Sequence, residues 1–335
     1  MLASFIIPAY NASTTIVRCL DSIYTLGFSE QEFEVICIDD RSTDNTIEVI
    51  EQYAKQHSNL TLLCQSENHR QGAARNRGIA IAKGKYIVYV DSDDESDKGV
   101  VKALQLAEVH ELDMVAMHYI NVDEHGNISE KEAIKIDGVF SGIEMQTQQA
   151  YWCSGPVPYL YNTAFLQRVN YPFTEDVLFE DSDYVNFHLY YAQRMMYNSE
   201  CSYRVHYNSQ STTHTLSYKH VADYFLLGTR MLVFYNSLVD SSTEFARGIR
   251  EGGSWNVYKS CLMLFKLCSV DDIKHFYKRI DNFIDRNNYS HYKTPTYFWT
   301  PWTKLCIKHK NIAICIATIG QYAYKLMILL KKIIS

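Results

Sequence analysis

Short apolar runs alternate with amphipathic segments over the first 117 residues. The apolar runs are bounded by polar turns, a pattern typical of buried strands, at residues 3–7, 33–38, 60–64, 86–90 and 113–117. The segments between them carry apolar residues at helical spacing, which predicts helices at residues 14–24, 46–54, 71–82 and 98–110. Strands that are apolar on both faces and alternate with helices form mostly parallel sheets covered on both sides. The predicted fold class is therefore α/β, with Pro8 expected to end the first strand.

The alternation weakens after residue 121. A hairpin is expected over residues 122–128, where Gly126-Asn127 is a turn signal, followed by a strand at 155–161 and a helix at 180–193. Beyond residue 217 the spacing is helical, which predicts helices at residues 218–238, 255–267 and 270–287. The chain is thus expected to divide into an α/β part, residues 1–217, and a helical C-terminal part, residues 218–335.

Composition excludes some classes of protein. With 47% hydrophobic residues among 335, the chain can bury a sizeable core, and its formal charge of −6 does not favour nucleic-acid binding. Nine cysteines are scattered without a CxxC pair, so neither a disulfide framework nor a zinc site is indicated. The first eight residues lack the basic start of a signal peptide, which predicts a cytoplasmic protein.

The last segment differs in charge from the rest. Residues 287–335 contain seven lysines and no Asp or Glu, and residues 311–334 place apolar side chains near one helical face. This pattern favours an interfacial helix on an anionic membrane, which would make the protein peripheral on the inner face of the plasma membrane. The alternative is an ordinary domain helix with a solvated basic face.

Three predicted strands end in polar sequence: residues 8–11, 39–42 and 91–94. Ligands of parallel sheets bind beyond the carboxyl ends of the strands, so all three segments are expected to face one crevice. Asp91, Asp93 and Asp94 would repel one another unless a cation or hydrogen-bond donors neutralise them, and oxygen ligands suit Mg²⁺ or Mn²⁺. Alternatively, this is a polar loop in which Asp93 or Asp94 caps the next helix.

Four segments, at residues 5–11, 38–44, 67–78 and 90–94, resemble in order the motifs of family 2 glycosyltransferases of the GT-A fold. The resemblance extends from residue 3 to about residue 215. It implies a Rossmann-like, mostly parallel sheet flanked by helices, with a C-terminal helical extension. It also implies that residues 1–97 bind a UDP-sugar, that residues 98–217 carry the acceptor and catalytic part, and that Mn²⁺ or Mg²⁺ binds the diphosphate. The chain departs from the family in having Arg41 where glycine is commoner.

The resemblance assigns donor binding to a set of residues from these segments and one later segment: Pro8, Ala9, Tyr10, Asp40, Asn68, Arg75, Asp91 and Arg204. Among them, Asp40 and Asn68 resemble polar contacts to uracil, and Arg75 resembles the basic residue near the ribose and diphosphate. Arg204 lies in residues 203–206, which with residues 209–211 resemble a flexible basic segment that closes over the diphosphate. Alternatively, Tyr10 is a strand-end core aromatic and Asp40 a helix N-cap.

The resemblance also names metal ligands and a base. Asp93 resembles the metal ligand, with Asp94 as the alternative, and His206 is a further candidate ligand that could instead be an ordinary surface histidine. Residues 179–184 resemble the family's Glu-Asp catalytic motif, in which Asp181 is the expected base and Glu180 orients the acceptor.

Asp183 is the competing assignment for the base. The alternative for all the acids of this motif is that they stabilise a helix N-terminus.

The leading hypothesis is a metal-dependent inverting glycosyltransferase. It would move a sugar from a UDP-sugar to a hydroxyl of a glycan or lipid-linked acceptor in surface polysaccharide biosynthesis. One alternative is a nucleotidyltransferase acting on sugar phosphates, which would release pyrophosphate in place of UDP. Another is a catalytically silent sugar-nucleotide-binding subunit.

Overall fold

A computed structural model describes residues 1–129, 133–134, 136–147, 155–208, 217–263 and 270–286 of the chain. The chain separates into two compact units, residues 1–211 and residues 212–335. Each unit is described below by itself.

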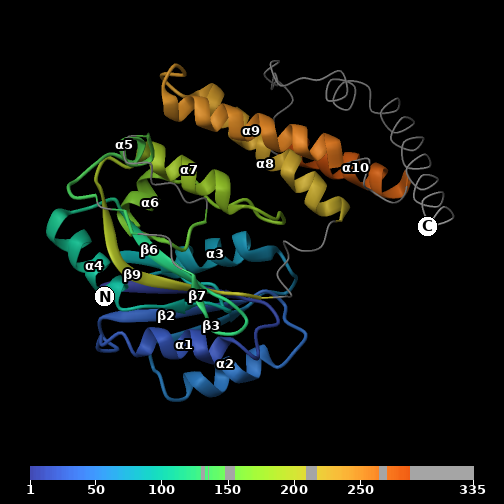
Figure 1. Cartoon of the computed structure of the whole chain (residues 1–335). Helices are drawn as coiled ribbons and strands as arrows, with labels where there is room; N and C mark the ends of the chain where they lie inside the picture. The colour runs from blue at the N-terminus through green and yellow to red at the C-terminus, as the bar shows by residue number, and fades with distance from the viewer. Residues whose placement is uncertain (130–132, 135, 148–154, 209–216, 264–269, 287–335) are drawn as a thin grey trace, which may run out of the picture. The chain divides into compact units, whose positions relative to one another are not determined.

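The described part of the first unit is built on one sheet (Figure 1). Its strands are β1 (Ala3–Ala9), β2 (Phe33–Asp39), β3 (Leu60–Cys64), β4 (Tyr86–Tyr89), β5 (Glu95–Ser96), β6 (Met114–Val122), β7 (Ile128–Ser129), β8 (Tyr159–Asn162) and β9 (Met195–His206). They lie in the order β3-β2-β1-β4-β8-β6-β9-β5, with β7 paired to β6. Neighbours among β1 to β4 are parallel, as are β6 and β9, whereas β8 is antiparallel to both β4 and β6.

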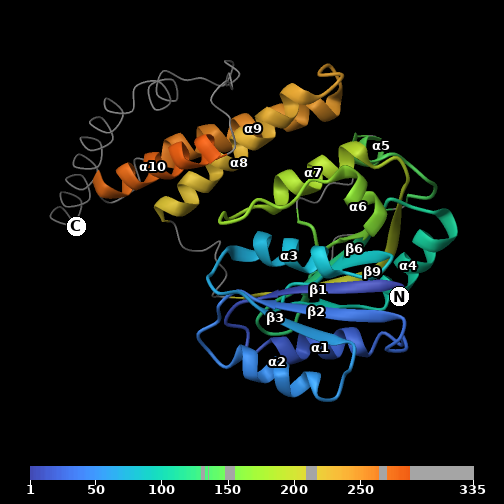
Figure 2. The same cartoon turned by 180° about the vertical axis from the view of Figure 1, so that it is seen from behind.

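Helices cover both faces of this sheet. They are α1 (Ile16–Tyr24), α2 (Thr46–Ala54), α3 (Arg70–Ile81), α4 (Gly99–His110), α5 (Gly142–Thr147), α6 (Thr163–Val169) and α7 (Asp181–Tyr191). Two opposite views place α1 and α2 on one face and α3, α6 and α7 on the other (Figures 1 and 2). Because both faces are covered, every residue of β1, β2 and β4 is buried. The predicted α/β fold with a mostly parallel sheet is confirmed.

Two local expectations were wrong. The first strand continues through Pro8 to Ala9, because β4 pairs with β1 only as far as Ile6, so Pro8 has a strand neighbour on one side alone. The first part of the expected flexible segment, residues 203–206, is the end of β9, a strand of 12 residues paired with β6, and its second part, residues 209–211, lies outside the described residues. The mixed polar sequence of β9 gives little local strand signal, and its partner lies about 80 residues away in the chain.

The described part of the second unit contains α8 (Tyr218–Ser237), α9 (Glu244–Met263) and α10 (Val270–Arg286). α8 packs against both α9 and α10. α9 begins 11 residues before the expected start at residue 255, and Gly253 within it allows close approach to Gly228 of α8. The expected interfacial helix at residues 311–334 lies outside the described residues. Among the helices described, none has the length and apolar character that crossing a membrane requires.

Candidate active site

The ends of β1 and β2 meet at one edge of the sheet, as the motif spacing predicts. The backbone N–H of Asp40 donates to the carbonyl oxygen of Ala9 at 2.8 Å, and the N–H of Asn11 donates to Ser42 Oγ at 2.9 Å. Arg41 has a φ of +68°, a left-handed conformation that glycine adopts more readily. This explains why glycine is commoner here in the family that the sequence resembles.

The Asp40 carboxylate binds the start of α3. Its carboxylate accepts hydrogen bonds from Gln65 Nε2 at 2.7 Å and from the backbone N–H groups of His69 and Arg70, both at 2.8 Å. His69 is the N-cap residue of α3 and Arg70 is its first residue, so Asp40 binds the start of this helix from a distant part of the chain and is not itself an N-cap residue. Burial raises the pKa of Asp40 although these hydrogen bonds oppose the shift. Asn68 donates to the Asp40 carbonyl oxygen at 3.0 Å.

The side chains of the β1 end have different exposures. Pro8 and Ala9 are buried within the sheet. Tyr10 directly follows the strand and is 50% exposed, so its ring is not a core aromatic. An exposed tyrosine at the carboxyl end of a parallel strand lies where ligands of such sheets bind.

The acidic turn after β4 is anchored by β9. Asp94 is 5% exposed and accepts hydrogen bonds from Tyr203 Oη at 2.9 Å and from the His206 backbone N–H at 2.8 Å. Asp93 Oδ2 accepts from Asn208 Nδ2 at 2.8 Å. Burial, together with repulsion from Asp91 and Asp93, raises the pKa of Asp94 to about 8, and burial also raises the pKa of Asp93.

This turn fits a divalent cation by its donor chemistry. Asp93 and Asp94 accept hydrogen bonds from neutral donors, and the positive charge of Arg18 only partly offsets the burial that raises the pKa of Asp93. Carboxylate oxygens with unbalanced charge are suited to Mg²⁺ or Mn²⁺. In the described part of the chain, however, the side chains form no group of three or more His, Cys, Asp or Glu residues arranged around one metal position.

The two basic residues of β9 contact acids beside this turn. Arg204 forms an ion pair with Asp97, with Nε and Nη2 both 2.6 Å from Oδ2. The Nε2 atom of His206 contacts the Glu95 carboxylate. Both residues therefore lie next to the acidic turn, on a paired strand and with acidic partners of their own.

Arg75 connects the acidic turn to the start of α7. Its Nη2 atom donates to Asp91 Oδ1 at 2.8 Å, and its Nη1 atom donates to Glu180 Oε1 at 2.5 Å. The Arg75 side chain is 2% exposed, and that of Glu180 is 6% exposed. Asp91 and Glu180 lie 89 positions apart in the numbering (91 and 180), yet one guanidinium binds both.

The acids of α7 differ in exposure. Burial raises the pKa of Glu180 to about 7, although Arg75 lowers it. Asp183 is 2% exposed and accepts a hydrogen bond from Tyr171 Oη at 2.9 Å. Asp181, the first residue of α7, is partly exposed. Of the two assignments for the base, Asp181 is the more accessible to an acceptor.

Aromatic packing also holds α7 close to β4. Phe173 stacks on Tyr184 of α7 with ring centroids 3.6 Å apart, and Tyr89 of β4 shares a hydrogen bond of 2.9 Å with the Tyr184 hydroxyl. Asn76 of α3 exchanges two hydrogen bonds of 3.0 Å with the Phe173 backbone. These contacts hold the start of α7 close to the end of β4.

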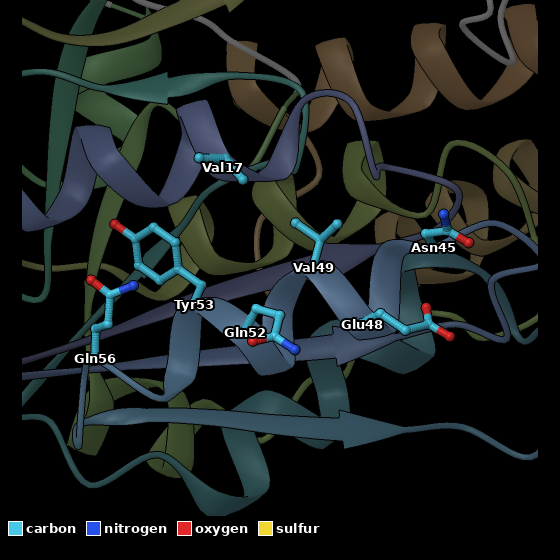
Figure 3. A pocket seen from close by; sticks show the side chains of 7 residues that line it. All are labelled: Val17, Asn45, Glu48, Val49, Gln52, Tyr53 and Gln56. Atoms are coloured by element: carbon cyan, nitrogen blue, oxygen red, sulfur yellow. The ribbon is translucent and has the colours of Figure 1, made fainter.

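A groove on the surface of the first unit lies apart from these acids. It has a volume of about 580 Å³ and runs along α1 and α2 (Figure 3). Its lining residues are Val17, Asn45, Glu48, Val49, Gln52, Tyr53 and Gln56. None of the residues predicted to bind the donor, the metal or the acceptor lines it.

Sequence reasoning missed three side chains that hold the acidic turn. Tyr203 and Asn208 donate to Asp94 and Asp93, and an Arg18 Nη2 donates to the Asp93 carbonyl oxygen. Arg18 lies on α1 and the other two lie more than 100 residues after the turn. No local motif marks such partners, because only the folded sheet brings them together.

Comparison with known families and proteins gives consistent matches. Residues 4–171 match the family described as "Glycosyl transferase family 2". The poly(ribitol-phosphate) beta-glucosyltransferase of Bacillus spizizenii is 42% identical over 95 residues, which are 28% of this chain and 15% of that protein. The uncharacterized glycosyltransferase EpsJ of Bacillus subtilis is 29% identical over 231 residues, which are 66% of this chain and 65% of EpsJ. The chain thus covers less than two thirds of the length of either relative.

A solved structure is similar over nearly the whole chain. The crystal structure of Staphylococcus aureus TarS 1–349 in complex with UDP-GlcNAc has a TM-score of 0.66, with coverage of 97% of this chain and 92% of that one. The two sequences are 19% identical in this alignment. At that identity, the likeness establishes the shared fold.

Proposed function

The chain belongs to glycosyl transferase family 2, and we propose that it is a glycosyltransferase that performs metal-dependent inverting transfer from a UDP-sugar. The observation that carries the proposal is the double ion pair of Arg75, which joins the acidic turn at Asp91 to the acids at the start of α7. A donor bound at the first group of acids would therefore lie within reach of the second group.

We propose Pro8, Ala9, Tyr10 and Asn68 as the nucleobase contacts and Asp91 as the ribose contact. The exposed Tyr10 ring can stack on a pyrimidine. The binding of UDP-GlcNAc and UDP by TarS, a protein of the same fold, supports a UDP-sugar as donor.

The acceptor would be a hydroxyl of a glycan or of a lipid-linked saccharide. Some relatives are named poly(ribitol-phosphate) glycosyltransferases, so polyol phosphate polymers should also be tested as acceptors. A surface polysaccharide would then be the product.

In the proposed reaction, Asp181 removes the proton from the acceptor hydroxyl. The hydroxyl oxygen bonds to the anomeric carbon on the face opposite the diphosphate, and the bond between that carbon and the diphosphate oxygen breaks, so that UDP leaves. Glu180, which Arg75 binds at the start of α7, would orient the acceptor. Asp93 and Asp94 would hold Mn²⁺ or Mg²⁺, which stabilises the charge developing on the leaving diphosphate.

The experiment that tests this function is a UDP-release assay with Mn²⁺ over a panel of UDP-sugars, including UDP-GlcNAc and UDP-glucose. We expect UDP from at least one donor, and a loss of release when EDTA removes the metal. Release of pyrophosphate from a sugar phosphate and a nucleotide would identify a nucleotidyltransferase instead. Donor binding with no turnover on any acceptor would favour a silent binding subunit.

We also propose that the basic C-terminal segment binds an anionic membrane surface. The proposal comes from its seven lysines, its lack of acids and its amphipathic spacing. The test is sedimentation with vesicles of phosphatidylglycerol and phosphatidylcholine, with vesicles of phosphatidylcholine alone as the control. The full chain should sediment with the anionic vesicles and a chain ending at Lys310 should not; equal recovery of both in the supernatant would refute membrane binding.

A further inference from the structure

Arg75 is almost completely enclosed, and its contacts leave little capacity for a ligand. The residue is 1% exposed, and its two terminal nitrogens donate to Asp91 and Glu180. Its Nε atom is buried and has no hydrogen-bond partner among the described residues. A guanidinium that binds the phosphates of a donor must present N–H groups to the cleft, whereas this one is directed at two protein carboxylates.

The ion pairs of Arg75 are a poor way to stabilise a fold. Removing the guanidinium and the Glu180 carboxylate from water carries a desolvation penalty of several kcal/mol per ion, whereas the Asp91 side chain stays 26% exposed. A well-packed apolar side chain often serves stability equally well. The guanidinium instead orients its two carboxylate partners relative to each other. Its planar fork fixes the angle between two carboxylates, which a flexible lysine ammonium does not.

The contacts around Arg75 also connect the acids after β4 with the acids at the start of α7. Its guanidinium carbon lies 5.4 Å from the centre of the Phe173 ring, which stacks on Tyr184 of α7. Its own helix, α3, begins at the carboxylate of Asp40. α3 therefore contacts the end of β2 through its N-terminus and the acidic turn after β4 through Arg75. It contacts the start of α7 through Arg75 and through Phe173, whose ring stacks on Tyr184.

We propose that Arg75 is a positioning residue for glycosyl transfer, one that sets the spacing between the donor-binding acids after β4 and the catalytic acids of α7. It acts through Asp91 and Glu180 and does not touch the substrate. This inference rests on the proposed function and replaces the direct donor contact that the family resemblance implies for Arg75. If the link is broken, the donor still binds, but the base is displaced from the acceptor hydroxyl.

The test compares kcat, KM and UDP affinity of Arg75→Met and Arg75→Lys with those of the wild type, using UDP release from UDP-GlcNAc, or from the donor that the panel identifies, with Mn²⁺. Displacing a reacting group by about 1 Å costs on the order of 100-fold in rate, so Arg75→Met should lower kcat by about that factor while its UDP affinity stays near that of the wild type. Arg75→Lys keeps the charge but cannot bind both carboxylates in one geometry, and its kcat should stay at least about tenfold below wild type. Arg77→Met, on an exposed position of the same helix, is the matched control and should keep the wild-type kcat and KM.

A double variant separates positioning from stability. Glu180→Gln in the Arg75→Met background removes the buried carboxylate that Arg75→Met leaves unpaired, so the melting temperature should recover. Because Glu180 has a proposed role in transfer, kcat of the double variant is compared with that of Glu180→Gln alone and should stay below it. Recovery of kcat together with melting temperature would mean that Arg75 acts only through stability, and would overturn the proposal. If Arg75→Met does not fold, the kcat of Arg75→Lys tests the proposal, because this variant retains the positive charge.

Two further outcomes would also overturn it. Weaker UDP binding with an unchanged kcat in the Arg75 variants would show a direct donor contact, and an Arg75→Lys variant with the wild-type kcat would show that the fork geometry is not needed. A wild type that releases no UDP from any UDP-sugar would instead refute the proposed function. The wild-type measurement and the ratios of variants to wild type therefore test the two ideas separately.

Discussion

Ionisable side chains in the first unit differ in burial, and burial decides which of them can act on a substrate. Glu180 is 5% exposed and one of its oxygens is held by Arg75, so it is suited to orientation. Asp183 is committed to the Tyr171 hydroxyl. Asp181 alone among these three acids of α7 is partly exposed at the helix start, which is why we assign the proton transfer to it.

His188 shows the energetic cost of burial at the scale of one residue. It is 1% exposed, its Nδ1–H donates to the Tyr184 carbonyl oxygen at 2.8 Å, and burial lowers its pKa from 6.5 to about 4. Between these two pH values the unfolded chain binds more protons than the folded protein, so stability must fall as the pH falls from 6.5 towards 4.

We predict that His188→Phe reduces this acid sensitivity. From the two pKa values, His188 should cost the wild type about 2 kcal/mol of unfolding free energy at pH 5 relative to pH 8, a loss that the variant lacks. Urea unfolding of both proteins at the two pH values measures the difference. The same pH dependence in both proteins would mean that His188 is not held neutral by burial.

At the scale of elements, α3 determines how the site is assembled. Its residue Gly72 packs against the loop before α7, where an added Cβ would lie 2.4 Å from the Thr174 carbonyl oxygen. Its residue Asn76 binds the Phe173 backbone. The glycine in this run is therefore explained by close packing with a distant loop.

Gly72→Ala should consequently destabilise the protein by about 1–3 kcal/mol, because an overpacked contact with backbone cannot relax cheaply. Gly248→Ala is the matched control, since Gly248 is also helical and has nothing within 4 Å of an added Cβ. That change should be neutral or stabilise by up to about 1 kcal/mol through helix propensity. Thermal unfolding of the two variants would contradict this account if Gly72→Ala were as stable as Gly248→Ala.

The elements that sequence could predict are those whose signal is local. The apolar runs and helical spacing of the first 110 residues gave α2 and β3 with their observed bounds, because α2 has apolar residues at helical spacing and β3 is a short apolar run, although β3 lies at the sheet edge and is buried only at Leu60. β9 was missed because strand pairing with β6 stabilises a mixed polar segment that has little propensity of its own. The sequence places Pro8 at the end of a strand because it does not show that Pro8 pairs on one side only. That pairing depends on how the strands are arranged in the sheet.

At the scale of the whole molecule, the motifs locate the acids but not their partners. Three strand ends were expected to meet, and the hydrogen bonds between the ends of β1 and β2, with the link from Arg75 to Asp91, agree with that expectation. The sequence could not indicate that Tyr203 binds Asp94, or that Arg75 binds Glu180, because those pairs are more than 100 residues apart and carry no spacing rule. The central claim is that the acids following β4 and the acids at the start of α7 act on the same bound donor.

The most direct test of this claim compares Asp181→Asn, Asp183→Asn and Asp93→Asn with the wild type. Turnover is measured as UDP release from the active donor, and Mn²⁺-dependent UDP binding is measured by calorimetry. Loss of a general base costs roughly 10²- to 10⁴-fold in rate, so Asp181→Asn should lose turnover by about that factor and still bind UDP with Mn²⁺. Asp183→Asn can keep the hydrogen bond from Tyr171 and should remain active, whereas Asp93→Asn should lose the effect of Mn²⁺ on UDP binding. Near-wild-type turnover of Asp181→Asn would contradict the account.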